Sequence, residues 1–144
     1  FAIAANEVLS LLGPAHPAHA AILRDLRAHL AGAAAAQDTS GAWHTVINAP
    51  GTYLESTGTA AFACALTTAI SRGRAGAEFS GAAARAMERV CSWINDAGDL
   101  THASAGTPVM PGTAGYNGIP LAVTTFSQGL GMLALASALE QPSS

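Results

Sequence analysis

The stretch that decides the fold is TYLESTGTAAFACALTTAI, residues Thr52 to Ile70. Thr52 and Glu55 have the T-x-x-E spacing of a capping box, in which the threonine hydroxyl and the glutamate carboxylate each bind a free amide at the start of a helix. The run that follows, from Ala60 to Leu66, is almost entirely apolar. A helix that is apolar on all sides is buried on more than one face. We therefore predict a central helix that begins at about Thr52 and is covered by other helices.

The composition indicates one helical domain and excludes two classes of partner. The 144 residues suffice for a single core, half of them are hydrophobic, and only 10% are charged, against about a quarter in typical domains. Six arginines, no lysine and a net charge of −3 leave no basic surface for nucleic acid. No run approaches the roughly 18 apolar residues that a membrane span needs. The low charge suggests that other protein normally covers part of this surface.

The two cysteines allow two interpretations, and the first residue indicates how the sequence relates to a longer one. A disulfide between Cys64 and Cys91, on consecutive predicted helices, is possible. Free cysteine is among the most buried residue types, so two free buried thiols are the favoured interpretation. The chain begins with Phe1 inside an apolar-periodic segment. We expect it to be part of a longer sequence, and no targeting signal or compartment is predicted.

Apolar periodicity and the breakers between periodic segments predict five helices in antiparallel hairpins with short connections. They span about Ala2–Leu12, Pro17–Ala36, Thr52–Arg72, Ser80–Ile94 and Thr125–Leu139. The fourth should face inward through Ala84, Met87, Val90, Cys91 and Ile94. Glycines, prolines and threonines favour a loop over residues 95 to 123, with a short hairpin as an option. Such an open all-α array leaves an apolar edge, which a second copy or further chain must cover.

Three blocks of sequence carry a family resemblance. They are Gly41–Ile47 followed by Tyr53–Ala60; Gly106–Pro111 followed by Tyr116–Pro120; and Ser127–Ala136, which contains SQGLG and LALA. In this order they resemble the unsaturated glycuronyl hydrolases. The similarity is strongest to the unsaturated rhamnogalacturonyl hydrolases of glycoside hydrolase family 105, which are akin to family 88.

The resemblance implies both a fold and a reaction. It implies that residues 1 to 144 form a single domain, the C-terminal part of an (α/α)6 barrel whose N-terminal half lies outside this sequence. Enzymes of this family protonate the enol ether of a Δ4,5-unsaturated uronic acid and add water, and the resulting hemiketal rearranges to release the neighbouring sugar. This chemistry needs a carboxylic acid that can deliver a proton. The family's catalytic aspartate is expected upstream of Phe1, as is an Arg-Gly-Asn-Gly-Trp-like pocket segment.

Five residues of the matching blocks are candidates for binding the oligosaccharide substrate, each with a structural alternative. Trp43 could be an aromatic platform for a sugar or a core residue. His44 could contact a substrate carboxylate. Glu55 could line the pocket, although capping the helix is the simpler explanation. Tyr116 and Gln128 could face the pocket mouth or fix the long loop.

Other functions have less support in the sequence. No His, Cys, Asp or Glu pair has metal-ligand spacing, so we predict no metal and no cofactor. The expected partners are an unsaturated oligosaccharide and either the remainder of the barrel or a second copy of the chain. The main alternative is a non-catalytic helical module that kept the barrel surface and works by association with protein. A different α/α-barrel enzyme, such as a lyase or an epimerase, is disfavoured by the blocks around Trp43 and Glu55.

Overall fold

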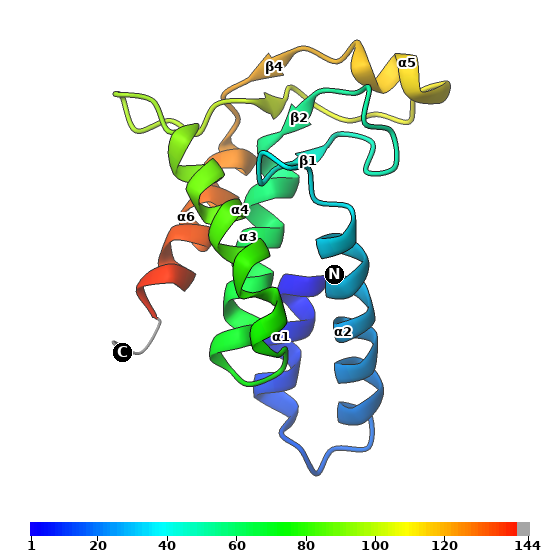
Figure 1. Ribbon diagram of the computed structural model, residues 1–144, viewed down its shortest axis with the longest axis vertical. Helices are drawn as coiled ribbons and strands as arrows, with labels where there is room; N and C mark the ends of the chain where they lie inside the picture. Colours follow the sequence, from blue (N-terminus) through cyan, green and yellow to red (C-terminus); the bar gives the residue numbers. More distant parts are fainter. Residues whose placement is uncertain (141–144) are drawn as a thin grey trace.

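The computed structural model describes residues 1 to 140 and consists of antiparallel helical hairpins with short strands at one end (Figure 1). Helices α1, α3 and α6 run in one direction, and α2 and α4 run back (Figure 1). The helices are α1 (Ala2–Leu12), α2 (His19–Ala35), α3 (Ser56–Ser71), α4 (Ser80–Ser92), α5 (Gly112–Asn117) and α6 (Thr125–Leu139), with a 3-10 turn, η1 (Ala77–Phe79). None of these helices is both long enough and apolar enough to cross a membrane.

Helix α3 is the centre of the molecule, as the sequence predicts. It contacts α1, α2, α4 and α6. Its alanines allow these helices to approach closely, because a methyl group is the smallest side chain that still excludes water from a helix contact. The residues that fill the core around it include Ala60, Ala63, Leu66 and Ala69 of α3, Leu26 and Leu30 of α2, Val90 of α4 and Ala134 of α6.

The predicted start of α3 is wrong by four residues. The helix begins at Ser56, and its N-cap is Glu55, whose carboxylate accepts a hydrogen bond from the Gly58 amide at 2.8 Å. The Thr52 hydroxyl instead donates to the Ala49 carbonyl at 2.8 Å and closes the preceding turn. The cause is strand pairing: β2 (Leu54–Glu55) pairs with β1 (Trp43–His44), which holds the backbone before Ser56 extended.

The predicted inward face of α4 is only partly right. Val90 is buried, and Met87 and Ile94 are half-buried, but Ala84 and Cys91 are exposed. Three alanines take their place in the contact with α3, and these are Ala82, Ala83 and Ala86. Compared with the prediction, α4 is therefore rotated about its axis so that its alanines face α3. Small side chains permit the closest approach of the two helices.

The two cysteines are free and lie in different environments. Cys64 is buried, and burial raises the pKa of its thiol. Cys91 is exposed, which corrects the prediction of two buried thiols. Its position follows from the rotation of α4, which turns Cys91 to the outer surface.

The loop predicted over residues 95 to 123 contains the strand pairing that the sequence left as an option. Strand β3 (Ala103–Ser104) pairs with β4 (Leu121–Ala122), and the short helix α5, which the sequence does not predict, lies between them. All four strands and α5 lie at one end of the helical array (Figure 1). We call this the loop end of the molecule.

Gly41 shows how closely the turn before β1 approaches α4. Its φ angle is 89°, and a Cβ atom built there would lie 2.4 Å from the carbonyl oxygen of Arg85. We expect Gly41→Ala to lower the free energy of unfolding by about 1–3 kcal/mol, because backbone atoms must move to admit the methyl group. Gly51→Ala is the matched control, since a Cβ atom added to Gly51 would have no other atom within 4 Å. Equal denaturation midpoints for the two variants would contradict this close contact.

Helices α1 and α6 expose apolar side chains, in accord with the predicted apolar edge. They are Phe1, just before α1, Val8 and Leu11 of α1, and Phe126, Met132, Leu133 and Leu139 of α6. Exposed apolar groups that gather on neighbouring elements mark surfaces for contact with protein or ligand. A groove lies between the two helices, because the same cavities are lined by residues of both.

Candidate functional site

Two adjoining cavities form a cleft near the loop end. One, of about 230 Å³, is lined by residues that include His44, Glu55, Ser104 and Thr107. The other, of about 370 Å³, is lined by residues that include Phe1, His29, Phe126 and Leu130. Both are bordered by Thr57, Gly58 and Phe62, so they form one continuous depression over the start of α3. We call it the loop-end cleft.

The β1–β2 pairing brings three of the five predicted site residues to this cleft. Trp43 lies opposite Glu55 in the register, and His44 lies opposite Leu54. Trp43, His44 and Glu55 all line the smaller cavity. Trp43, His44, Glu55 and Thr57 belong to the blocks that carry the family resemblance, whereas Phe62 and Ser104 lie outside those blocks.

Glu55 is buried and accepts three hydrogen bonds. Its Oε2 atom accepts from the Thr57 hydroxyl at 2.6 Å and from the Gly58 amide at 2.8 Å. Its Oε1 atom accepts from the Ser104 amide at 3.1 Å. All three contacts use the carboxylate as an acceptor, so Glu55 caps α3 and ties it to β3. This arrangement favours the structural explanation over direct substrate contact.

Trp43 lines the cleft with little of its surface, because the residue is only 1% exposed. Its indole Nε1 donates to the Ala33 carbonyl at 2.7 Å, which anchors β1 to the end of α2. Its ring centre is 4.8 Å from that of Phe62, and the two rings are inclined by 46°. The contacts of Trp43 are therefore those of a core residue that supports Phe62 in the cleft wall.

His44 is oriented by contacts through both ring nitrogens. Nδ1 lies 2.5 Å from the carbonyl oxygen of Thr52, and since a carbonyl can only accept, Nδ1 carries a hydrogen. Nε2 lies 3.7 Å from an oxygen of Asp38. Hydrogen bonds from Ser40, with a smaller contribution from His44, hold the pKa of the Asp38 carboxyl below its ordinary value. The imidazole thus has a fixed orientation at the edge of the cleft, with a charged neighbour that the sequence analysis missed.

Tyr116 and Gln128 do not line the loop-end cleft. The Gln128 side chain accepts from the Leu100 amide at 2.9 Å and donates to the Leu100 carbonyl at 3.0 Å, which ties α6 to the segment before β3. Tyr116 is half-buried on α5, and its neighbour Asn117 accepts a hydrogen bond from the Tyr53 amide at 2.9 Å. The contacts of Gln128 favour the loop-fixing alternative for this residue, whereas the hydrogen bond on α5 belongs to the neighbour of Tyr116.

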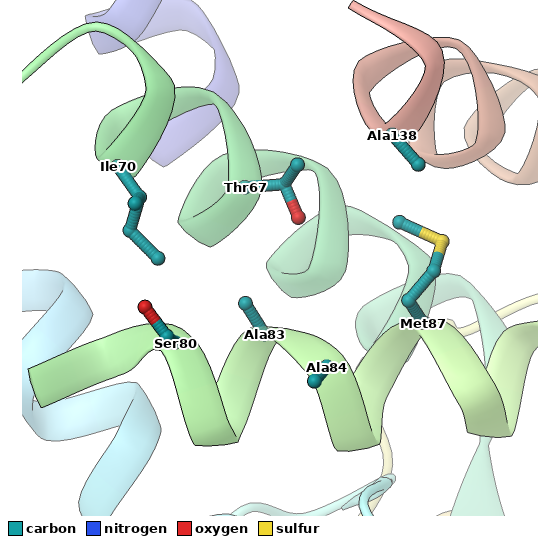
Figure 2. A pocket seen from close by; sticks show the side chains of 7 residues that line it. All are labelled: Thr67, Ile70, Ser80, Ala83, Ala84, Met87 and Ala138. Carbon is teal, nitrogen blue, oxygen red and sulfur yellow. The ribbon is translucent and has the colours of Figure 1, made fainter. Parts of the chain in front are cut away.

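A further cavity of about 260 Å³ lies among α3, α4 and α6, and Figure 2 shows the side chains that line it. Met87, Ala83 and Ser80 of α4 face Thr67 and Ile70 of α3, with Ala138 of α6 near Met87 (Figure 2). Its lining contains no titratable side chain. Within residues 1 to 140, no group of three or more His, Cys, Asp or Glu side chains could hold a metal ion.

The hairpins, with strands and a cleft at one end, are those of a partial (α/α)6 barrel. Residues 1–141 match the profile of glycosyl hydrolase family 88, and the chain belongs to this family. The predicted family resemblance and the predicted fold class are therefore confirmed.

Individual proteins of known sequence or structure are similar to the chain. The unsaturated rhamnogalacturonyl hydrolase YesR of Bacillus subtilis is 29% identical over 140 residues, which are 96% of this chain and 39% of YesR. A possible member of family GH105 from Salmonella enterica serovar Paratyphi A superimposes with a TM-score of 0.90 at 29% identity, over 96% of this chain and 37% of that one. A family 88 glycosyl hydrolase from Bacteroides vulgatus has a TM-score of 0.85 at 19% identity, over 98% and 41% of the two chains. The chain thus spans about two fifths of the length of these relatives.

Proposed function

We propose that this chain is the C-terminal part of a glycoside hydrolase that acts on oligosaccharides ending in a Δ4,5-unsaturated uronic acid, of the unsaturated rhamnogalacturonyl hydrolase type. The observation that carries the proposal is the loop-end cleft, whose smaller cavity is lined mostly by residues of the blocks that resemble this family. Similarity to YesR over 96% of the chain supports the same substrate class. The substrate would be a product of pectin cleavage by a lyase.

The proposed reaction requires a proton donor, which we place outside this sequence. Hydration of the enol ether requires a carboxylic acid to protonate the double bond before water adds. Glu55 accepts three hydrogen bonds and donates none, and the pKa of Asp38 is held low, so neither is arranged as the acid. We propose that an aspartate upstream of Phe1 supplies the proton, and that the 144-residue chain alone is inactive.

We propose His44 as the contact to the uronate carboxylate. Its side chain is 11% exposed, lines the cleft and is held by Thr52 and Asp38 in a fixed orientation. Trp43 and Glu55 would support the cleft from below. For Gln128, the contacts with Leu100 favour support of the surrounding loops over substrate binding.

Replacing His44 tests this role in the protein at its natural length. We expect His44→Gln to raise KM for an unsaturated rhamnogalacturonan disaccharide about tenfold, equivalent to about 1.4 kcal/mol of binding, with little change in kcat. The readout is the loss of ultraviolet absorbance as the enol ether is consumed. His16→Gln is the control, since His16 is exposed and belongs to the connection between α1 and α2, which lies at the end of the array opposite the strands (Figure 1). An unchanged KM in His44→Gln would exclude this contact.

A second candidate function is a non-catalytic module that associates with protein. The exposed apolar side chains of α1 and α6 favour it, because such a surface suits a protein partner. The two proposals differ in one outcome: only the enzyme consumes the unsaturated disaccharide when the protein is assayed at its natural length.

A further inference from the structure

A separate polar cavity lies between α4 and the turn that precedes β1. Its volume is about 310 Å³, at the small end of ligand pockets, and it shares no lining residue with the loop-end cleft. It is lined by Thr39, Ser40, Arg85, Glu88, Arg89 and Ser92. The sequence analysis assigned no role to any of these residues.

Both arginines in this cavity are held in place by neutral groups. Arg85 and Arg89 are four residues apart on α4 and therefore lie on the same face of the helix. The Arg89 Nε donates to the Ser40 carbonyl at 2.9 Å, and an Arg85 amino group donates to the Gln37 side-chain oxygen at 2.6 Å. Among residues 1 to 140, neither guanidinium has a carboxylate within 4.0 Å.

The groups that hold the arginines are themselves fixed. Gln37 donates to the carbonyls of Gly41 at 2.9 Å and Ala82 at 3.0 Å, which leaves its side-chain oxygen for Arg85. The Arg89 guanidinium lies 5.5 Å from the centre of the Trp93 ring, a distance suited to a cation–π contact. His102 stacks on the same indole at 5.1 Å. The two positive charges are thus positioned before any ligand binds.

The charges and hydroxyl groups indicate the chemistry of a ligand. Two guanidinium groups and the exposed Glu88 give the cavity a net charge of +1. A guanidinium binds a carboxylate through two parallel hydrogen bonds, and serine and threonine hydroxyls bind sugar hydroxyls. We propose that this cavity binds the carboxylate of a uronic acid residue in an acidic oligosaccharide, as a second contact outside the loop-end cleft. The choice of a sugar acid rests on the proposed function, whereas the affinity for a carboxylate does not.

The test measures binding of a saturated sugar acid, so it does not depend on enol ether hydrolysis. The protein at its natural length is titrated with trigalacturonate, neutral galactotriose and sulfate by calorimetry, while the indole resonance of Trp93 is followed by NMR. We expect trigalacturonate to bind and to shift the Trp93 signal, and neutral galactotriose to do neither. The double variant Arg85→Gln, Arg89→Gln should weaken trigalacturonate binding at least about tenfold and leave the rate of disaccharide hydrolysis unchanged.

Three further variants make the result specific. Arg24→Gln is the matched control, because Arg24 is an exposed arginine on α2 whose side chain is 74% accessible. It should leave trigalacturonate affinity within about twofold of wild type. Glu88→Gln should raise the affinity about threefold by removing a like charge. The variant Arg85→Lys, Arg89→Lys keeps the charge, so it remains informative if the glutamine variant does not fold, and it should lose about threefold to fivefold.

Two results would overturn the assignment. One is trigalacturonate affinity that is the same in wild type and in a folded variant of both arginines. The other is sulfate binding as tight as trigalacturonate binding, which would indicate a general anion site rather than one for an acidic sugar. Either result leaves the proposed hydrolase activity untouched, because that activity is measured separately on the unsaturated disaccharide.

Discussion

Replacing Glu55 with alanine is expected to lower the free energy of unfolding by about 2–4 kcal/mol. The change removes the N-cap of α3 and leaves the amides of Gly58 and Ser104 without their acceptor, and the side chain is only 6% exposed. Because α3 contacts four other helices, loss of its cap should destabilise the whole molecule. The measurement is chemical denaturation followed by circular dichroism.

Two comparison variants distinguish the stabilising effect of the N-cap from the effect of removing a negative charge. Glu55→Gln keeps one acceptor oxygen in the same place and should lose about 1 kcal/mol. Glu78→Ala removes an exposed acidic side chain and should change stability by less than about 0.5 kcal/mol. If Glu55→Ala unfolded at the same denaturant concentration as Glu78→Ala, the three hydrogen bonds would not stabilise the start of α3.

Replacing Trp43 with alanine is expected to cost about 3–5 kcal/mol, the range for removing a large aromatic side chain from a core. The variant also leaves the Ala33 carbonyl without the indole hydrogen bond and removes the ring beneath Phe62. Trp43→Phe keeps the aromatic contact and should lose less than half as much. A Trp43→Ala variant with wild-type stability and a raised KM would show instead that the indole is a platform for the sugar.

The helix boundaries that depend on local signals could be predicted from the sequence. The segment Ala2–Leu12 agrees with the predicted range, because Gly13 and Pro14 end it, and Thr125–Leu139 agrees as well. The start of α3 could not be predicted from the T-x-x-E spacing. That local signal competes with the pairing of β2 with β1, which depends on residues about ten positions earlier in the chain.

The face of α4 that packs on α3 and some of the contacts around the cleft could not be predicted from the sequence either. Large apolar residues suggested one face of α4, but alanines occur on several faces and only the packing against α3 selects among them. Trp43 and Glu55, which belong to the first of the matching blocks, are brought together by the pairing of β1 with β2. The contact of Asp38 with His44 depends on the turn before β1, and that of Gln128 with Leu100 joins two separate elements, so no spacing in the sequence reports either of them.

The most direct test of the central claim is the ultraviolet absorbance of an unsaturated rhamnogalacturonan disaccharide during incubation with two proteins. One is the 144-residue chain, and the other is a longer form that includes the residues preceding Phe1. We predict that absorbance stays constant with the chain alone and falls with the longer form. A fall with the chain alone would mean that one of its nine acidic residues protonates the enol ether, and would contradict the placement of the catalytic acid upstream.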